Sequence, residues 1–267
     1  MEVPEEREEP SRVLKKLGRR EAASEREQRM LRKISDEYKT LEEVFDRRTL
    51  FILYKMLNEG IIDLLHGIIA SGKEARIYAA ETPGGEHVAV KIYLTSTAEF
   101  KRGRLKYIVG DPRFKGVSTR AYKLIYAWAS KEYKNLLKAH ECGVNVPRPL
   151  GQEGNVLVMK FIGRDFTPAP TLRERSSLSP WIFRQVMNQM RRLYRWAGLV
   201  HADFSEFNIF YFDRKPILFD FAQSVVLGHP QAEEFLVRDI SNILKFFAKR
   251  GVEVCDLETG IRWVKGK

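Results

Sequence analysis

The stretch LVHADFSEFNIFYF, residues 199–212, together with PILFDFAQ, residues 216–223, constrains this chain more than any other part of it. It places Asp203, Asn208 and Asp220 between apolar runs that are typical of strands. One carboxylate can accept the proton of an attacking hydroxyl, whereas an amide and a second carboxylate supply the oxygen ligands that Mg²⁺ prefers. The spacing therefore predicts a loop for phosphoryl transfer. The alternative, in which Asp203 caps a turn and Asn208 bonds its own backbone, stays open until the upstream sequence is considered.

The order of these residues, H-x-D-x-x-x-x-N followed by an aspartate borne on a strand, is that of the catalytic and metal loops of protein kinases. In that order Asp203 is the expected catalytic base, and Asn208 and Asp220 are the expected metal ligands. Asp220 is counted with the catalytic residues as well.

Upstream, residues 67–73 spell G-x-x-x-x-G-K, one residue short of a P-loop. Glu74 replaces the Ser or Thr that would bind Mg²⁺, and no helical pattern follows. Residues 76–81 and 87–94 instead alternate like strands around the turn TPGGE. We interpret this stretch as a hairpin lid over phosphates, in which Ser71 and Gly72 allow close backbone approach and Lys73 adds charge.

Lys91, in VAVKIYL, stands where kinases carry the lysine that binds the α- and β-phosphates, and it is counted with the catalytic residues. Glu132 lies in a predicted helix, WASKEYKNLLKAHECG, that ends near Gly143. We assign Glu132 as the ion-pair partner of Lys91. The competing interpretations are an exposed strand lysine and a solvated helix glutamate. The helix should turn one apolar stripe to the sheet, made by Trp128, Tyr133, Leu136 and Leu137.

The run NVLVMKFIG predicts a buried strand that leads into a hinge. Met159 would line the back of an adenine pocket, and backbone groups of Lys160 and Ile162 would bond the base. As pattern alone, a methionine in such a strand is more often a simple core residue.

The fold class predicted is α+β, a trimmed two-lobed protein-kinase-like fold with added N-terminal helices. Residues 1–24 are expected to form a charged flexible tail, and residues 25–60 two helices, the second capped by Asp46 and closed by Gly60. Residues 61–162 make the expected N-lobe, and residues 163–267 a reduced C-lobe. In that C-lobe one helix follows Ser179, and another spans HPQAEEFLVRDISNILKFFAKRG.

The formal net charge is +11, and most of it comes from one short stretch. We call residues 101–123 the basic segment. It is predicted to be a loop, and it holds eight cations against Asp111 alone: Lys101, Arg102, Arg104, Lys106, Arg113, Lys115, Arg120 and Lys123. Such a concentration favours contact with a polyanion, and a solvated loop is the alternative.

Other bulk features are those of a reduced, cytoplasmic protein. Cys142 and Cys255 have neither metal-site spacing nor a disulfide framework. The acidic start is unlike a signal peptide, and no apolar run is long enough for a membrane span. We therefore expect no membrane partner.

The motifs SGKEARIY, VAVKIY, KEYKNL, LVMKFIG, LVHADFSEFN and FDFAQSV occur in this order, and the chain resembles the RIO family of atypical serine/threonine protein kinases, most closely its type-one branch. The match covers roughly residues 46–251. The resemblance implies binding of ATP with Mg²⁺, with Mn²⁺ as an alternative ion, and a role in maturation of the small ribosomal subunit. It implies roles for Ser71, Lys73, Lys91, Glu132, Lys160, Ile162, Asp203, Asn208 and Asp220, as assigned above.

The chain departs from the branch at Ala70, at Lys160, where glutamate is usual, and at Phe221 and Ala222, which replace Val-Ser. Residues 221–267 are also too few for an activation segment and the helices that bind peptides in ordinary kinases, and Ala202 replaces the arginine of H-R-D.

Three functions follow as expectations. The first is an autophosphorylating serine/threonine kinase or ATPase that acts on a pre-ribosomal particle. The second is a nucleotide-switched ribosome-binding assembly factor with little kinase activity on other proteins. The third is a small-molecule phosphotransferase, which the reduced C-lobe disfavours. The basic segment is expected to touch ribosomal RNA, with Ser118 or Thr119 as the autophosphorylated residue.

Overall fold

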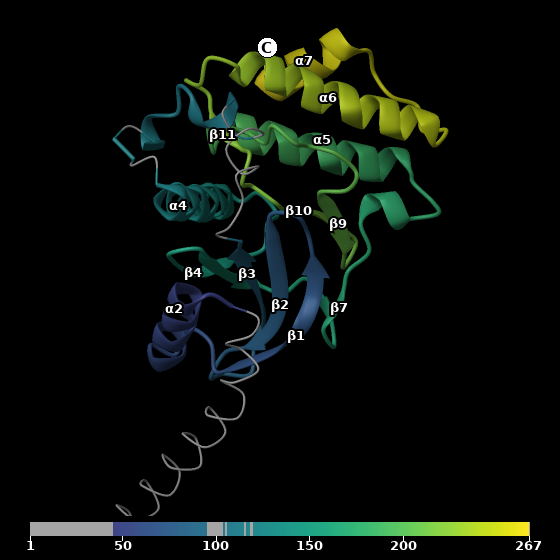
Figure 1. Cartoon of the computed structure of the whole chain (residues 1–267). Coiled ribbons are helices and arrows are strands. Elements are labelled where there is room, and N and C mark those ends of the chain that lie inside the picture. The colour runs from purple at the N-terminus through teal and green to yellow at the C-terminus, as the bar shows by residue number, and fades with distance from the viewer. Residues whose placement is uncertain (1–44, 95–103, 105, 115, 118–119, 267) are drawn as a thin grey trace, which may run out of the picture. The chain divides into compact units, whose positions relative to one another are not determined.

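The computed structural model in Figure 1 describes residues 45–94, 104, 106–114, 116–117 and 120–266. The predicted tail, the first N-terminal helix, Ser118 and Thr119 lie outside these residues. The chain divides into two units, the second of which is residues 52–267. Both predicted lobes belong to the second unit. None of the helices in the described ranges is long and apolar enough to cross a membrane.

Helix α2, Arg47–Asn58, begins where the sequence predicts. The Asp46 carboxylate accepts hydrogen bonds from the backbone nitrogens of Arg48 and Thr49, at 3.0 and 3.1 Å, so it is the N-cap. Gly60 follows with φ +69, a conformation that glycine adopts without strain. Lys55 on this helix pairs with Glu153 at 3.0 Å, in the fourth strand of the sheet described next.

An antiparallel sheet forms the core of the N-lobe (Figure 1). Its strands lie in the order β1-β2-β3-β5-β4, with bounds β1 Leu64–Ser71, β2 Ala75–Glu81, β3 His87–Tyr93, β4 Pro149–Glu153 and β5 Val156–Lys160. The turn TPGGE joins β2 to β3, as predicted, with Gly85 N–H donating to the Thr82 carbonyl at 2.9 Å. Strands β3 and β5 pair so that Lys91 lies opposite Leu157.

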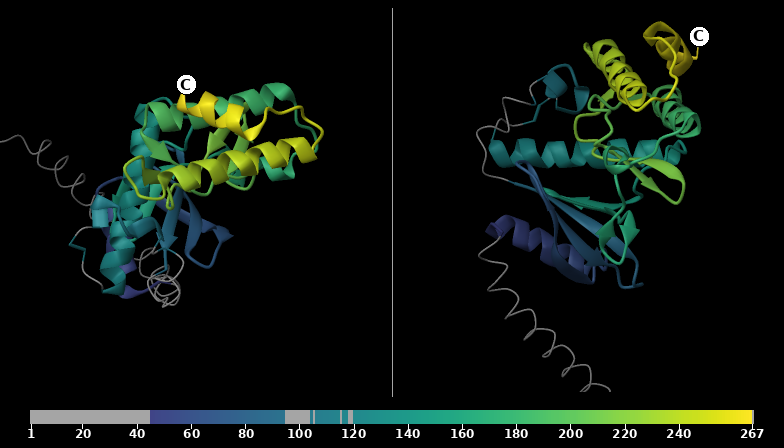
Figure 2. Two further views of the ribbon diagram at one scale, coloured as in Figure 1. Left: turned by 90° about the horizontal axis from the view of Figure 1, so that it is seen from above. Right: turned by 90° about the vertical axis from the view of Figure 1, so that its right-hand side faces the viewer.

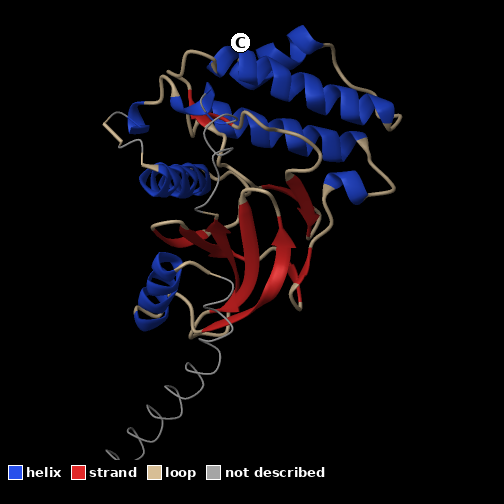
Figure 3. Ribbon diagram, in the orientation of Figure 1, coloured by secondary structure: helices blue, strands red, loops and turns tan. Residues whose placement is uncertain are grey.

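Helices make up most of the C-lobe, and Figure 3 shows them gathered apart from the five-stranded sheet. The elements that follow β5 are β6 Gly163–Arg164, β7 Thr167–Pro168, η2 Leu172–Glu174, α5 Pro180–Arg195, β8 Leu199–Val200, β9 Ile209–Phe212, β10 Lys215–Leu218, β11 Val225–Val226, α6 Ala232–Lys249 and α7 Leu257–Lys265. The Ser179 hydroxyl caps α5 by accepting from Ile182 N, as expected. Helix α7 was not predicted from the sequence, although Asp256 caps it by accepting from Thr259 N at 2.9 Å.

Helix α4, Ala121–Glu141, lies between the sheet and helices α5 and α6, as the right-hand view in Figure 2 shows. It begins earlier than the predicted start near Trp128, because Leu124 and Ile125 extend the apolar period into the basic segment. Of the expected stripe, Trp128 and Leu136 are fully buried, and the Trp128 ring also lies near those of Tyr107 and Phe114 in the basic segment.

The described part of the basic segment is folded against the protein rather than a solvated loop. Pro112–Phe114 form a 3₁₀ turn, η1, and the last residues of the segment belong to α4. Tyr107 and Phe114 are buried, with ring centroids 6.4 and 6.2 Å from that of Trp128. Some of the eight cations are engaged internally, since Arg104 pairs with Glu74, and Arg113 with Asp111.

Two glycines of the segment provide a test of this packing. Gly110 and Gly116 both have positive φ, +89 and +79, so alanine strains either backbone by about 1–2 kcal/mol. A Cβ at Gly110 would lie 2.6 Å from Cδ of Pro230, whereas one at Gly116 would meet nothing within 4 Å. Gly110→Ala should therefore unfold at a Tm about 3 °C or more below that of Gly116→Ala, measured by calorimetry. Equal Tm values would contradict the packing of this segment against Pro230.

Candidate active site

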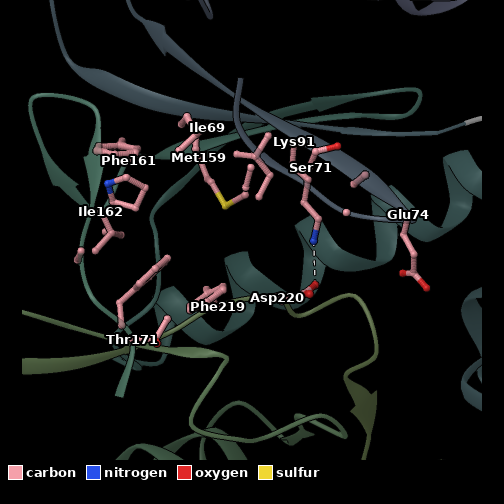
Figure 4. A pocket seen from close by; sticks show the side chains of 18 of the residues that line it. Ile69, Ser71, Glu74, Lys91, Met159, Phe161, Ile162, Thr171, Phe219 and Asp220 are labelled. Carbon is pink, nitrogen blue, oxygen red and sulfur yellow. Dashed lines mark hydrogen bonds and ion pairs between the residues drawn. The ribbon is translucent and has the colours of Figure 1, made fainter. Parts of the chain in front are cut away.

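A cavity of about 890 Å³ lies between the sheet and the C-lobe. Its walls come from the β1–β2 turn, from β3, from the residues after β5 and from the loop after β10 (Figure 4). Every predicted cofactor-binding residue lines it: Ser71, Gly72, Lys73, Lys91, Glu132, Met159, Lys160 and Ile162. Asp220 lines it as well, whereas Asp203 and Asn208 do not.

The β1–β2 turn presents exposed backbone and charge to the cavity. Gly72 N–H donates to the Ala75 carbonyl at 3.0 Å, which closes a tight turn. Residues 71–74 are all exposed, so Ser71 and Lys73 are accessible to a ligand. Glu74 adds a carboxylate to this edge, where the sequence predicted only cationic and neutral groups.

Lys91 is the charged centre of the cavity. Its buried ammonium lies 2.8 Å from Oε1 of Glu132 and 2.8 Å from Oδ1 of Asp220, the pair joined by a dashed line in Figure 4. Burial disfavours the charge, but Asp220 and Glu132 outweigh it and raise the pKa of Lys91 well above its usual value. The predicted contact between Lys91 and Glu132 is therefore present, and Asp220 is a second partner that the sequence did not specify.

Tyr93 completes this centre. It lies two residues after Lys91 on β3, and alternation along a strand places both side chains on one face. Its hydroxyl donates to Oε2 of the fully buried Glu132. Burial raises the pKa of Glu132, with Lys91 opposing that shift. The period-two spacing is the signal that could have found Tyr93.

Some backbone groups at the end of β5 and just after it already make hydrogen bonds within the protein. Lys160 N–H donates to the Arg148 carbonyl at 2.8 Å, and the Ile162 carbonyl accepts from Ala169 N at 2.9 Å. A ligand in the cavity would therefore be met by the Lys160 carbonyl and the Ile162 N–H. Met159 is almost fully buried beside them, at the cavity wall.

Asp203 and Asn208 form one bonded unit at the C-lobe side. The Asn208 amide donates to the Asp203 carbonyl at 2.8 Å and to its Oδ2 at 3.0 Å. Gln223, which lines the cavity, donates to the same Oδ2 at 3.4 Å, so it connects this unit to the cavity. Burial raises the pKa of Asp203, and the nearby negative charge of Asp220 adds to that shift. A carboxylate with a raised pKa is a better proton acceptor.

The backbone of the loop that carries Asp203 is hydrogen-bonded to Asp239, a residue that the sequence analysis missed. Asp239 is buried in α6 and accepts from the backbone nitrogens of Ala202, at 2.7 Å, and Phe204, at 3.1 Å. Ala202 has φ +63, a strained conformation that these bonds stabilise. Burial raises the pKa of Asp239 to about 7. A polar residue among the apolar positions of α6 was the available signal.

The donor set suits Mg²⁺. Both amide hydrogens of Asn208 are turned to Asp203, so its amide oxygen would be the atom to coordinate a metal ion, and Asp220 would contribute a carboxylate. Hard oxygen donors of this kind bind Mg²⁺, which takes one or two protein groups together with phosphates. Among the described residues no group of three or more His, Cys, Asp and Glu side chains forms a metal cage.

Comparison with known proteins agrees with this geometry. The model of the RIO domain matches residues 76–259. The chain belongs to the RIO family of atypical protein kinases. It is 40% identical over 238 residues to the RIO-type serine/threonine-protein kinase Rio1 of Methanocaldococcus jannaschii, which covers 88% of this chain and 80% of that protein. It is 43% identical over 220 residues to the human serine/threonine-protein kinase RIO1, which covers 80% of this chain but only 39% of the human protein.

A solved structure supports the fold of this RIO domain. The crystal structure of the Rio2 kinase–ADP/Mg²⁺–phosphoaspartate complex from Chaetomium thermophilum aligns with a TM-score of 0.59 at 24% identity. The alignment covers 80% of this chain and 66% of that one. The predicted kinase-like α+β fold is therefore confirmed.

His201 provides a pH test of this RIO domain. The ring is buried, its Nε2–H donates to the Phe219 carbonyl at 3.1 Å, and burial lowers its pKa to about 4. Between pH 6.5 and about 4 the unfolded chain binds a proton that the folded state does not, so stability falls as the pH falls through this window. The slope from this group is at most about 1.4 kcal/mol per pH unit.

The variant His201→Gln keeps a donor at the position of Nε2 but does not titrate. The free energy of unfolding, measured in urea without nucleotide, should fall more for the wild type than for the variant as the pH is lowered from 6.5 to about 4, so the difference between the two proteins isolates His201. Asp239 has the opposite effect, since its raised pKa lowers stability as the pH rises toward 7, but it is present in both proteins. The same slope in both proteins would show that His201 is protonated in the fold.

Proposed function

We propose that this protein is a Mg²⁺- and ATP-dependent serine/threonine kinase of the RIO type. The observation that carries the proposal is the position of Lys91, within 2.8 Å of both Glu132 and Asp220 at the wall of the 890 Å³ cavity. This arrangement brings side chains from β3, from α4 and from the loop after β10 into direct contact. Phosphoryl transfer depends mainly on such positioning and electrostatic stabilisation.

ATP would bind with its base against Met159 and its edge on the Lys160 carbonyl and the Ile162 N–H. Ser71, Gly72 and Lys73 would cover the phosphates, and Lys91, oriented by Glu132, would bind the α- and β-phosphates. Lys160 in place of glutamate does not oppose this, because its side chain is exposed and pairs with Glu86 at 3.7 Å.

Asp203 would orient the attacking hydroxyl and accept its proton, since Asn208 and Gln223 fix the carboxylate by hydrogen bonds. Asn208 and Asp220 would hold Mg²⁺, which would neutralise negative charge on the phosphates when bound. Mn²⁺ has the same preference for oxygen ligands. If water replaces the hydroxyl, the same groups would support ATP hydrolysis.

The substrate is proposed to be the protein itself and a small-subunit pre-ribosomal particle in the cytoplasm. The alternative function, a nucleotide-switched assembly factor, would use the same site. In that case phosphoryl transfer would set how long the ATP-bound state lasts. A small-molecule phosphotransferase is disfavoured, because α5, α6 and α7 account for most of the C-lobe and are needed to support the catalytic loop.

Replacement of the proposed base tests the kinase assignment. Asp203→Asn should lower the rate of phosphoryl transfer from labelled ATP by about 10²-fold or more, because a general base contributes about 10²–10⁴. ATP affinity, measured by fluorescence titration, should change little, since other groups bind the phosphates. The matched control is Asp213→Asn, at an exposed turn position with φ +46, where asparagine fits equally well and wild-type rates are expected. Wild-type turnover in Asp203→Asn would refute this role.

The basic segment is proposed to bind ribosomal RNA with its exposed cations. Lys106, Arg120 and Lys123 are exposed, and Lys101, Arg102 and Lys115 lie outside the described residues. If about four to six cations contact phosphates, log–log salt slopes of roughly −3 to −5 are expected. A phosphate on Ser118 or Thr119 would add a charge of about −1.5 to −2 and weaken this contact.

The triple variant Lys101→Ala, Arg102→Ala, Lys106→Ala should reduce the salt slope for small-subunit RNA by roughly 2–3. It leaves Arg104 intact, because that side chain pairs with Glu74. The control removes three exposed cations elsewhere, Arg184, Lys245 and Lys249, and so changes the net charge equally. Equal slopes in both variants would rule out RNA binding by the segment, and a phosphate mapped outside it would rule out the switch.

A further inference from the structure

The loop after Asp220 is held by side chains of α4. Asn135, fully buried, donates to the carbonyls of Phe221 at 3.1 Å and of Ser224 at 3.0 Å. Lys131, also buried, donates to the Ala222 carbonyl at 3.1 Å. Three carbonyls of one short loop are therefore bound by a single helix, the helix that also carries Glu132.

The orientation of the Asn135 amide is fixed by Arg113. The guanidinium Nη1 donates to Oδ1 of Asn135 at 2.6 Å. A guanidinium has only donors, so the amide oxygen must face Arg113 and both amide hydrogens must face the two carbonyls. Both amide hydrogens of Asn135 and its amide oxygen are thus hydrogen-bonded.

Arg113 is itself held in place. Its Nε donates to Oδ1 of Asp111 at 2.8 Å and its Nη2 donates to Oδ2 at 2.6 Å. The guanidinium therefore forms a bidentate ion pair with a buried carboxylate. Burial opposes ionisation of Asp111, but the bonds from Arg113 outweigh it and lower the pKa of Asp111. The basic segment therefore contributes a rigidly held cation that is aimed at Asn135.

The conformation of Asp220 depends on the loop residues on its C-terminal side. Its φ is +61, a left-handed conformation that is strained for a non-glycine residue. Such a conformation persists only where the surroundings over-determine it. The bonds from Asn135 to the carbonyls of Phe221 and Ser224 supply that constraint immediately after Asp220.

We propose that Asn135 and Arg113 are positioning residues that hold Asp220 in the conformation that binds Mg²⁺. Arg113, on the basic segment, fixes Asn135, and Asn135 fixes the backbone on the C-terminal side of Asp220. The proposal rests on the proposed use of Mg²⁺ and adds two residues from outside the cavity, since neither lines it.

The test compares two substitutions in adjacent residues of α4. Asn135→Asp keeps the acceptor for Arg113 but replaces the donor to the two carbonyls with a repelling oxygen. Leu136→Ala removes buried apolar volume but no hydrogen bond to the loop, and it is expected to lower stability through the cavity that it leaves. It controls for loss of stability alone.

The first readout is the Mg²⁺ concentration that half-saturates the Mg²⁺-dependent increase in ADP affinity. Asn135→Asp should raise it about tenfold or more, with ADP affinity in EDTA unchanged within about twofold. Leu136→Ala should leave both values at those of the wild type. Arg113→Lys should shift the half-saturation in the same direction, and the double variant should show no further loss beyond Asn135→Asp. Equal shifts in Asn135→Asp and Leu136→Ala would overturn the proposal.

The second readout needs neither metal nor nucleotide. Amide hydrogen exchange of Ser224, whose N–H donates to the Phe221 carbonyl at 3.2 Å, should be about tenfold faster in Asn135→Asp than in Leu136→Ala. Equal exchange in the two variants would show that Asn135 does not hold the loop, and so would overturn the proposal. If the wild type itself showed no Mg²⁺ dependence of ADP affinity, the proposed function would fail, and faster exchange in Asn135→Asp would still establish the contact between Asn135 and the loop.

Discussion

The rest of the active site depends on one buried cation shared by two carboxylates. Lys91 comes from β3, Glu132 from α4 and Asp220 from the loop after β10, so their contacts join the two lobes at a point. Removing one partner of a buried ion pair costs about 3–5 kcal/mol, because the remaining charge loses its compensation without regaining water. The sheet, the helix and the metal loop must therefore be placed correctly at the same time. Helix α4 meets this requirement, because it carries Glu132 and also binds the loop after Asp220.

Much of this arrangement can be predicted from the sequence because it depends on local patterns. Strand alternation predicted the hairpin of β2 and β3, and Ser179 and Asp46 marked the starts of α5 and α2 through side-chain caps. The spacing of Asp203 and Asn208 predicted a shared loop, and the structure bonds Asn208 to Asp203 directly. Motifs whose functional residues lie within a few positions of one another can therefore be found from the sequence alone.

The parts that could not be predicted all depend on contacts between distant segments. Trp128 has a helical spacing that fits the sheet, but it contacts Tyr107 and Phe114, whose rings lie in a stretch that is dominated by charge in the sequence. Asp239 and Asn135 are polar residues on largely apolar helix faces, and only the backbone groups opposite them explain their burial. Counting cations overstated the free charge of the basic segment for a related reason. Arg104 pairs with Glu74, which lies far from it along the chain, and Arg113 pairs with Asp111 in a geometry that charge counting does not reveal.

These pairings connect the basic segment to two walls of the cavity, the β1–β2 turn and the loop after β10. Arg104 joins it to the β1–β2 turn through Glu74, and Arg113 joins it to the metal loop through Asn135. A ligand that alters either wall must then alter the energy of the segment, and linkage requires the effect to be reciprocal. Whatever partner the exposed cations of the segment bind would change nucleotide affinity by the same factor by which nucleotide changes the affinity for that partner. The proposed binding of a polyanion would then be coupled to occupancy of the cavity to the extent that each ligand changes these contacts.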